Sequence, residues 1–263
     1  MKGFLEEYGL IIVVVAVILL MLLFGKTGYA KSIQDAILGS ADHIVETGEN
    51  ITKKEAKVGD TLDIEGTKYI VLEQKENNQA LVMTANSIGE REFHAVSYND
   101  VRPEDGQSVN TYEDSEIDKY LENDWYNSLS SKMKTAIQTT NIKQSSYGTD
   151  SMGLSYLKQE TGYKGQVYNT ISRHAFLPSV SEIGKAVDLK NPDKVKAFLV
   201  PINSGEREDD TYIWTRDSSK NYANGATYLE SYYGGLDHSP VGMMYGVRPA
   251  FVIDLSKVNY TVT

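Results

Sequence analysis

The hydrophobic and polar positions of this chain follow several different periods, which divide it into three parts. Residues 10–24, LIIVVVAVILLMLLF, contain no polar side chain, and the apolar stretch reaches back to Tyr8. A helix that spans a bilayer needs about 20 residues, with a lower limit of about 17. We therefore expect residues 1–31 to form a transmembrane or pilin-like anchor helix. A cleaved signal peptide and a buried core helix are the alternatives.

The next part of the chain changes from an apolar to a polar pattern. Ile33, Ile37 and Ile44 recur at helical spacing, and residues 46–57, ETGENITKKEAK, are polar and charged. The first pattern indicates a helix, and the second is typical of a linker. We expect a helical stalk and linker over residues 32–57, followed by a globular domain over residues 58–263.

The globular domain begins with alternating positions and continues with a helical period. TKYIVLEQ at 67–74 and QALVMTAN at 79–86 predict two antiparallel strands around a polar turn. Apolar residues then recur every four positions, which predicts one or two amphipathic helices that pack on the sheet. These residues are Ile117, Leu121, Trp125, Leu129, Met133 and Ile137.

Two helix starts and three short strands are predicted further along. A serine of LPSVSEIGKAV at 177–187 is placed to cap one helix, and Asn191 to cap another that has Pro192 at its first position. AFLVPI at 197–202, TYIWTRD at 211–217 and GVRPAFVIDL at 246–255 read as strands. The mixture of helical and strand patterns predicts an α+β domain.

Charge and cysteine content exclude several partners and chemistries. The net charge is −10, so the chain lacks the excess of basic residues with which proteins bind nucleic acid. It contains no cysteine, which excludes disulfides, thiolate metal sites and a cysteine nucleophile. We expect no nucleic acid among its partners.

The amino-terminal residues resemble those of Flp-type pilins. The resemblance rests on a glycine, acidic residues and a tyrosine before an unbroken apolar helix, as in GFLEEYGLII at 3–12. In such pilins a peptidase removes a short leader, and a glutamate neutralises the new amino terminus of a neighbouring subunit. The resemblance implies roles in assembly for Gly3 and Glu7. Glu7 lies one position short of the usual spacing, and a plain single-span anchor is the alternative.

The globular domain resembles an uncharacterised family of bacterial surface domains. The shared features are a Trp-x-Arg strand, here WTRD at 214–217, and a closing Gly-Val-Arg-Pro-Ala strand at 246–250. The family looks like a branch of the C-type-lectin-like fold, akin to formylglycine-generating enzymes. The resemblance covers residues 58–255 and implies a fold without an established activity. Trp214, Arg216, Arg248 and Pro249 are expected to be framework, with Arg248 bonded to loop carbonyls.

The sequence contains little that indicates catalysis. Formylglycine-generating enzymes use cysteines and copper, and this chain has no cysteine. The four histidines, His43, His94, His174 and His238, are scattered and lack the spacing of a ligand pair. We therefore expect no catalytic residues, no metal and no cofactor. A metal-dependent oxidase of the formylglycine-generating type is a further alternative.

The segment from Ser218 to Gly246 is the best candidate for a binding surface. Five of the 18 tyrosines lie there, between Asn, Ser, Gly and Asp. Tyrosine supplies rigid contact area at low entropy cost, and small polar residues adapt their hydrogen bonds. The alternative is that these tyrosines cover a sheet edge. The candidate ligand-binding residues are Tyr222, Asn224, Tyr228, Tyr232, Tyr233, Asp237, His238 and Tyr245.

These features predict a cell-surface, adhesin-like protein that binds an extracellular protein or glycan. C-type-lectin-like domains with this ending include the variable proteins of diversity-generating retroelements, and variation of the binding segment between strains is a narrower version of this hypothesis. The alternative is a Flp-like pilin subunit that self-assembles through its first helix and displays the domain on a filament. In either case the domain is expected outside the cell, held at the membrane by residues 1–31.

Overall fold

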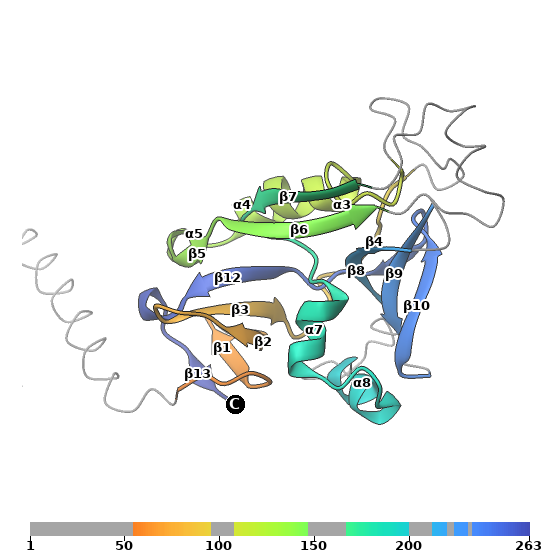
Figure 1. Cartoon of the computed structure of the whole chain (residues 1–263). Coiled ribbons are helices and arrows are strands. Elements are labelled where there is room, and N and C mark those ends of the chain that lie inside the picture. The colour runs from red at the N-terminus through yellow and green to blue at the C-terminus, as the bar shows by residue number, and fades with distance from the viewer. Residues whose placement is uncertain (1–54, 96–107, 147–166, 200–211, 220–223, 231–232) are drawn as a thin grey trace, which may run out of the picture. The chain divides into compact units, whose positions relative to one another are not determined.

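The computed structural model of the chain describes residues 55–95, 108–146, 167–199, 212–219, 224–230 and 233–263 (Figure 1). The chain divides into two compact units, Met1–Lys53 and Lys54–Thr263, and all described residues belong to the second. The predicted anchor and nearly all of the predicted stalk, with Gly3 and Glu7, lie outside the described residues.

The first sheet has six strands in the order β13-β1-β2-β3-β12-β5, and every neighbouring pair is antiparallel. The last strands of the chain therefore pair with the first ones. Its members are β1 (Thr61–Ile64), β2 (Thr67–Gln74), β3 (Gln79–Thr84), β5 (Ile137–Gln138), β12 (Ala250–Asp254) and β13 (Thr261–Val262).

Both faces of this six-stranded sheet are buried in apolar clusters. Successive side chains of a strand point to opposite faces. Ile70, Leu72, Leu81 and Met83 enter one cluster, and Tyr69, Val71, Ala80 and Val82 enter the other. The strands of this sheet consequently form the interior of the domain.

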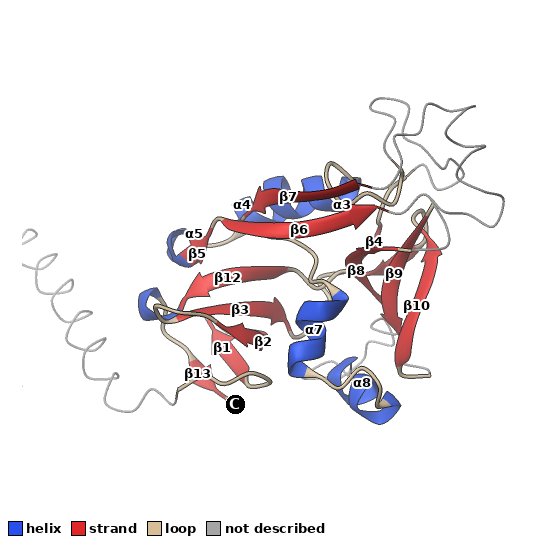
Figure 2. Cartoon of the chain, viewed as in Figure 1, coloured by secondary structure: helices blue, strands red, loops and turns tan. Residues whose placement is uncertain are grey.

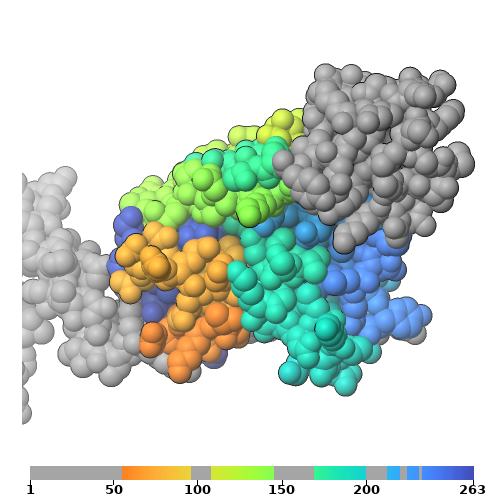
Figure 3. All heavy atoms as spheres, in the orientation of Figure 1, coloured from red at the N-terminus to blue at the C-terminus, as the bar shows by residue number. Residues whose placement is uncertain are grey.

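The second sheet has five strands in the order β10-β9-β8-β11-β4. The pairs are antiparallel except β11 with β8, which are parallel and meet at Gly246 and Ile213. β9 and β10 form a hairpin that reaches the surface beside the α7–α8 segment (Figure 3). The members are β4 (Glu90–Glu92), β8 (Tyr212–Ser218), β9 (Gly225–Glu230), β10 (Gly235–Pro240) and β11 (Met244–Gly246).

Short helices and a separate hairpin complete the domain. The hairpin β6 (Thr140–Ser146) and β7 (Val167–Arg173) lies beside the α3–α4 segment (Figure 1). The helices are α3 (Glu116–Lys119), the π-helical η2 (Tyr120–Trp125), α4 (Tyr126–Ser128), α5 (Ser131–Ala136), α7 (Val180–Ala186), α8 (Pro192–Leu199) and the 3-10 helix η4 (Leu255–Lys257).

Several predicted elements are confirmed by the structure. The strands predicted at 67–74 and 79–86 are β2 and β3. Ser179 caps α7 by accepting a hydrogen bond from the Glu182 backbone, while the Glu182 side chain accepts from the Ser179 backbone. Asn191 accepts from the Lys194 backbone at the start of α8, where Pro192 is the first helical residue.

Two predicted strands are corrected. Residues 197–199 of the predicted strand AFLVPI are the last turn of α8, because Val195 and Leu199 bury one face of that helix. GVRPAFVIDL is not one strand, since β11 ends at Gly246 and β12 begins at Ala250 in the other sheet. Arg248 and Pro249 lie at this transition between sheets.

The predicted fold class, an α+β domain behind a transmembrane helix, is wrong. Strands predominate in the described residues, and the helices are short (Figure 2). Within the described ranges no helix is long and apolar enough to cross a membrane. The periodic apolar residues at 117–137 were expected to build one or two amphipathic helices, but the structure divides them among several short helices and β5.

Candidate functional site: an aromatic face of the five-stranded sheet

The strand register gathers aromatic side chains on one face of the five-stranded sheet. Trp214 of β8 pairs with Tyr228 of β9, which pairs in turn with Asp237 of β10. Residues paired in register share a face, and so do residues two apart in a strand. Tyr212 therefore joins this face, and Tyr245 of β11 lies against it. We call Tyr212, Trp214, Tyr228 and Tyr245 the aromatic face.

The four rings of the aromatic face are in mutual contact. The ring centroid of Tyr245 lies 4.6 Å from that of Trp214, 4.8 Å from that of Tyr228 and 5.0 Å from that of Tyr212. Tyr212 meets Tyr228 edge-on at 5.4 Å. These separations suit the ring quadrupole, and such pairs add to the free energy gained from area burial alone. The four rings are therefore fixed relative to one another. Trp214 and Tyr228 are buried in the core, and Tyr212 and Tyr245 are partly buried against it.

Hydrogen bonds fix the polar ends of these rings. The buried Trp214 donates through Nε1 to the carbonyl of Arg91, at 2.9 Å. The Tyr245 hydroxyl is 3.0 Å from the Ser239 hydroxyl, and the Tyr228 hydroxyl donates to Asp237 at 3.4 Å. Burial raises the pKa of Tyr228, and the nearby Asp237 charge raises it further. Tyr228 is thus a neutral hydrogen-bond donor.

The structure unites some of the predicted ligand-binding residues and separates others. Tyr228, Asp237 and Tyr245 come together at the aromatic face. His238 pairs with Thr227, so its side chain lies on the reverse of the sheet, although its backbone N–H donates to the Asp237 carboxylate at 2.8 Å. Asn224 is half-buried in the turn before β9. Tyr222 and Tyr232 lie outside the described residues.

Apolar side chains are also exposed around this sheet. Tyr233 is 73% exposed, in the turn before β10. Leu236, Met243 and Met244 are 41–51% exposed, in β10, in β11 and in the turn between them. They make up four of the six exposed large hydrophobic side chains in the described part of the chain. Exposed apolar residues gathered in one region mark interaction sites more often than scattered ones.

Tyr212 and Ser239 were missed by the sequence analysis. The alternation of TYIWTRD places Tyr212 on the same face as Trp214, so a strand reading could have found it. Ser239 is opposite Ala226 in register, and its contact with Tyr245 depends on how β11 crosses to β8. No local pattern carries that information.

The residues assigned to the framework hold separate elements together. Arg216 forms a bidentate ion pair with Glu182 of α7, at 2.5 and 2.6 Å. It also donates hydrogen bonds to the backbone carbonyls of Lys143 and Leu177. Arg248 donates to backbone carbonyls, but they are those of Phe198 and Leu199 in the last turn of α8, where loop carbonyls were expected. Both arginines are almost fully buried.

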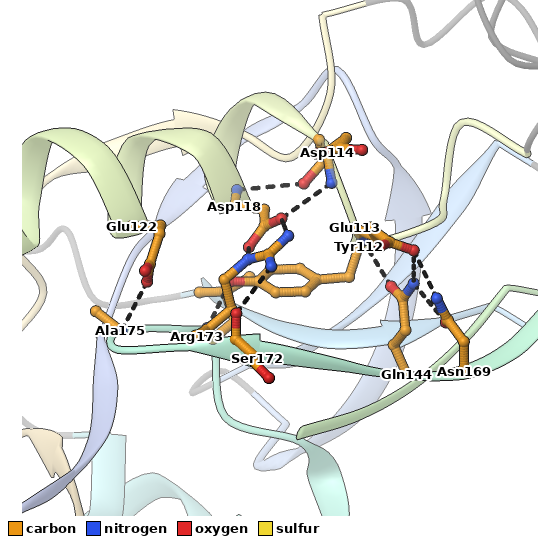
Figure 4. Close-up of polar contacts among 12 residues, drawn as sticks. Tyr112, Glu113, Asp114, Asp118, Glu122, Gln144, Asn169, Ser172, Arg173 and Ala175 are labelled. Carbon is orange, nitrogen blue, oxygen red and sulfur yellow. Dashed lines mark hydrogen bonds and ion pairs between the residues drawn. The ribbon is translucent and has the colours of Figure 1, made fainter. Parts of the chain in front are cut away.

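A second cluster of polar residues joins α3 and η2 to β7 (Figure 4). Arg173 pairs with both oxygens of Asp118, at 2.9 and 2.7 Å. Glu122 accepts hydrogen bonds from the backbone N–H groups of His174 and Ala175. At the far end, Glu113 bonds to Gln144 and Asn169 of the β6–β7 hairpin. The cluster fastens the hairpin to the helical segment.

Part of this cluster has the order of groups found in nucleophilic enzymes. Glu122 lies 2.7 Å from Nδ1 of His174, and Nε2 of His174 lies 3.0 Å from the Thr139 hydroxyl. Carboxylate, imidazole and hydroxyl form such a series in hydrolases. Here the other Glu122 oxygen holds two backbone N–H groups, and the imidazole stacks on Tyr126 at 4.4 Å. We interpret the series as a structural connection.

The other histidines also contact single carboxylates. His94 is buried with Nδ1 3.1 Å from Glu116, and Nδ1 of His238 is 3.3 Å from Asp237. Among the described residues no group of three or more His, Asp or Glu side chains is placed to hold a metal ion. His43 lies outside the described residues.

Comparison with known proteins relates most of the domain to one family. The model of a family described as a domain of unknown function, DUF6273, matches residues 77–255. This range contains every strand of the five-stranded sheet and all four residues of the aromatic face. No curated protein and no solved structure matches the chain. The resemblance to C-type-lectin-like domains therefore stays a prediction.

Proposed function

The chain belongs to the DUF6273 family, and we propose that it is a ligand-binding protein whose aromatic face recognises a protein or a glycan. The observation that carries the proposal is the set of four contacting rings, of which Tyr212 and Tyr245 are only partly buried. Exposed Asp237 lies beside them and bonds to Tyr228.

Physical chemistry supports recognition at this surface. Tyrosine rings that are already packed lose little side-chain entropy when a ligand covers them. Their hydroxyl groups and the carboxylate of Asp237 supply directional hydrogen bonds at the edge of an apolar area. This combination of an apolar surface with a few placed polar groups is the usual composition of a binding site.

Strain-to-strain variation of this segment stays a prediction, and the structure makes it more specific. Tyr228 is 8% exposed and contacts Trp214, so its replacement would disturb the sheet. Tyr233, Asp237 and His238 can change without opening a cavity, because their side chains are wholly or partly exposed. A comparison of this locus among isolates should show substitutions at these three positions and a constant Tyr228.

The binding proposal is tested with the fluorescently labelled full chain. Its binding is screened on a printed glycan array and against a peptide library displayed on phage. The binding found is then measured for Tyr212→Leu and Tyr233→Ser. Val58→Ser is the matched control, because Val58 is also exposed, at 42%, and lies outside the five-stranded sheet. Circular dichroism confirms that each variant folds.

We expect binding that Tyr212→Leu weakens by about tenfold and that Val58→Ser leaves unchanged, since one aromatic contact contributes about 1–2 kcal/mol. A chain that binds neither library would contradict the proposal. So would binding that both variants and the control weaken equally.

A further inference from the structure

Two carboxylates flank the tyrosines of the aromatic face. Asp237 is opposite Tyr228 in register, and Glu230 is opposite Tyr212. The Asp237 side chain is 59% exposed. Glu230 is almost fully buried and accepts a hydrogen bond from the backbone N–H of Tyr233 at 3.0 Å. Negative charge therefore lies along the β9–β10 side of the tyrosines.

Two basic groups accompany this sheet, at different positions. Nδ1 of His238 is 3.3 Å from the Asp237 carboxylate, but the His238 side chain lies on the reverse of the strand. The Arg91 guanidinium lies 3.3 Å above the ring of Tyr120, at the β4 edge. Arg91 is opposite Tyr245 in register, so it borders the aromatic face on its β4 side, whereas Asp237 and Glu230 border the β9–β10 side.

The chemistry of the β9–β10 side suits a positively charged group. The face of a tyrosine ring carries a negative quadrupole, which attracts ammonium and guanidinium groups, and a neighbouring carboxylate strengthens the attraction. Arg91 on Tyr120 is an example of the same contact within this molecule. The net charge of −10 would also draw basic partners toward the chain.

We propose that the ligand of the aromatic face is a basic peptide, with a lysine or arginine side chain that lies against Tyr212 and Tyr245 and pairs with Asp237. This inference rests on the proposed binding function and names its ligand class. Tyr228 already donates to Asp237, which holds the carboxylate next to the rings. The accessible parts of the partly buried rings of Tyr212 and Tyr245 provide the area against which the aliphatic part of the side chain packs.

The test uses the full chain and two labelled probes, a hexalysine peptide and a hexaglutamine peptide of equal length. Binding is measured by fluorescence anisotropy in about 0.15 M salt, where interactions between distant charges are largely screened. The variants are Asp237→Asn and Tyr212→Leu. Glu76→Gln is the matched control, because it removes one exposed carboxylate from the β2–β3 turn of the other sheet.

We expect the hexalysine probe to bind and the hexaglutamine probe not to bind. Asp237→Asn and Tyr212→Leu should each weaken hexalysine binding about fivefold or more, and Glu76→Gln by less than about twofold. Equal weakening by Asp237→Asn and Glu76→Gln would overturn the inference, because it would show attraction to the net charge alone.

Failure of this inference can be told apart from failure of the proposed function. If the full chain binds neutral glycans and loses them on Tyr212→Leu, while hexalysine does not bind, the basic-peptide inference is overturned and the binding function stands. If the glycan array, the phage library and hexalysine all remain unbound, both are overturned.

Discussion

The two sheets of the domain are both mainly antiparallel, yet they bury their side chains differently. In the six-stranded sheet, β3 and β12 bury nearly every side chain on both faces. In the five-stranded sheet, β10 exposes three of its six residues, and β11 exposes Met244. Mostly aliphatic residues, together with Tyr69 and Phe251, fill the first sheet, whereas four contacting aromatic rings lie on one face of the second.

This difference separates the source of stability from the candidate site of recognition. Buried apolar area on both faces of a sheet contributes most of the free energy of folding. A face with half-exposed rings gives up part of that contribution and keeps contact area for a ligand. The comparison makes predictions about which substitutions unfold the chain and which ones change binding.

The largest effect is expected from a paired substitution, one in each sheet. Phe251 is fully buried and contacts Tyr69 at 5.3 Å and Trp125 at 5.9 Å. Phe251→Ala should lower the free energy of unfolding by about 3–5 kcal/mol, because it leaves a cavity. Tyr245→Ala, at a half-exposed ring, should cost about 1 kcal/mol. Urea denaturation measures both, and equal losses would break the comparison.

A second pair of substitutions tests the turn that presents β10. Gly234 has φ +72°, and a Cβ there would overlap the carbonyl of Pro192 in α8. Gly66 has φ +80° and open space around it. Gly66→Ala should cost about 1–2 kcal/mol for the left-handed backbone alone. Gly234→Ala should cost more, because the turn must also move away from α8. If the two variants are equally stable, the turn does not depend on α8.

The β6–β7 hairpin belongs to neither of the two sheets, and substitutions at its contacts provide a third set of stability changes for the comparison. Glu122→Gln should cost about 1–2 kcal/mol, because the carboxylate holds two backbone N–H groups. Thr139→Ala should change the stability by less than about 0.5 kcal/mol, since Thr139 is exposed. A fluorophosphonate probe should leave Thr139 unlabelled. Covalent labelling that Glu122→Gln abolishes would show an activated hydroxyl instead of a structural connection.

The smallest expected effect is on the pH dependence of stability, through one carboxylate of the six-stranded sheet. Burial pulls the pKa of Glu73 upward, but hydrogen bonds from Lys185 and Lys75 outweigh it and hold the pKa below its usual value. The ionised carboxylate therefore stabilises the fold above its unfolded-state pKa, and this contribution is lost as the pH falls through the folded-state pKa.

The measurement is urea denaturation at a series of pH values from about 6 to about 3, which brackets the carboxyl titrations. Glu73→Gln should flatten the loss of stability on the acid side. Glu76→Gln, in the β2–β3 turn, is the control and should leave the curve unchanged. Curves that coincide for wild type and Glu73→Gln would contradict the assigned role of the ion pairs.

The fold was predictable from sequence where local patterns decide the structure. Alternation revealed β2 and β3, and cap residues revealed the starts of α7 and α8. The pattern over 117–137 gave a wrong prediction, because apolar residues keep a four-residue spacing even where one helix ends and another begins. Leu129 has an extended backbone, Ser130 caps a new helix, and Ile137 begins β5.

The candidate site was predictable only in part. Composition pointed to Tyr228, Asp237 and Tyr245, which the structure places together. Alternation along β8 would have added Tyr212, but nothing in the sequence shows that β11 pairs with β8 through Gly246 and Ile213 and so brings Tyr245 against these rings. Such pairings depend on packing across the whole domain and leave no local pattern. The pairing of Glu122 with His174, 52 residues apart, was missed for the same reason.

Among the strands that the structure describes, β10 is at the edge of its sheet, which has a consequence for solubility. An edge strand offers unpaired N–H groups, on which a second copy could grow a continuous sheet and aggregate. Pro240 has no N–H, and the His238 N–H already donates to the Asp237 carboxylate. A proline within a strand has its nitrogen on the side that is not hydrogen-bonded to a neighbouring strand. Because backbone N–H groups two residues apart point to the same side of a strand, the His238 N–H lies on that side as well. The strand that carries Asp237 is thus also protected against self-templated polymerisation.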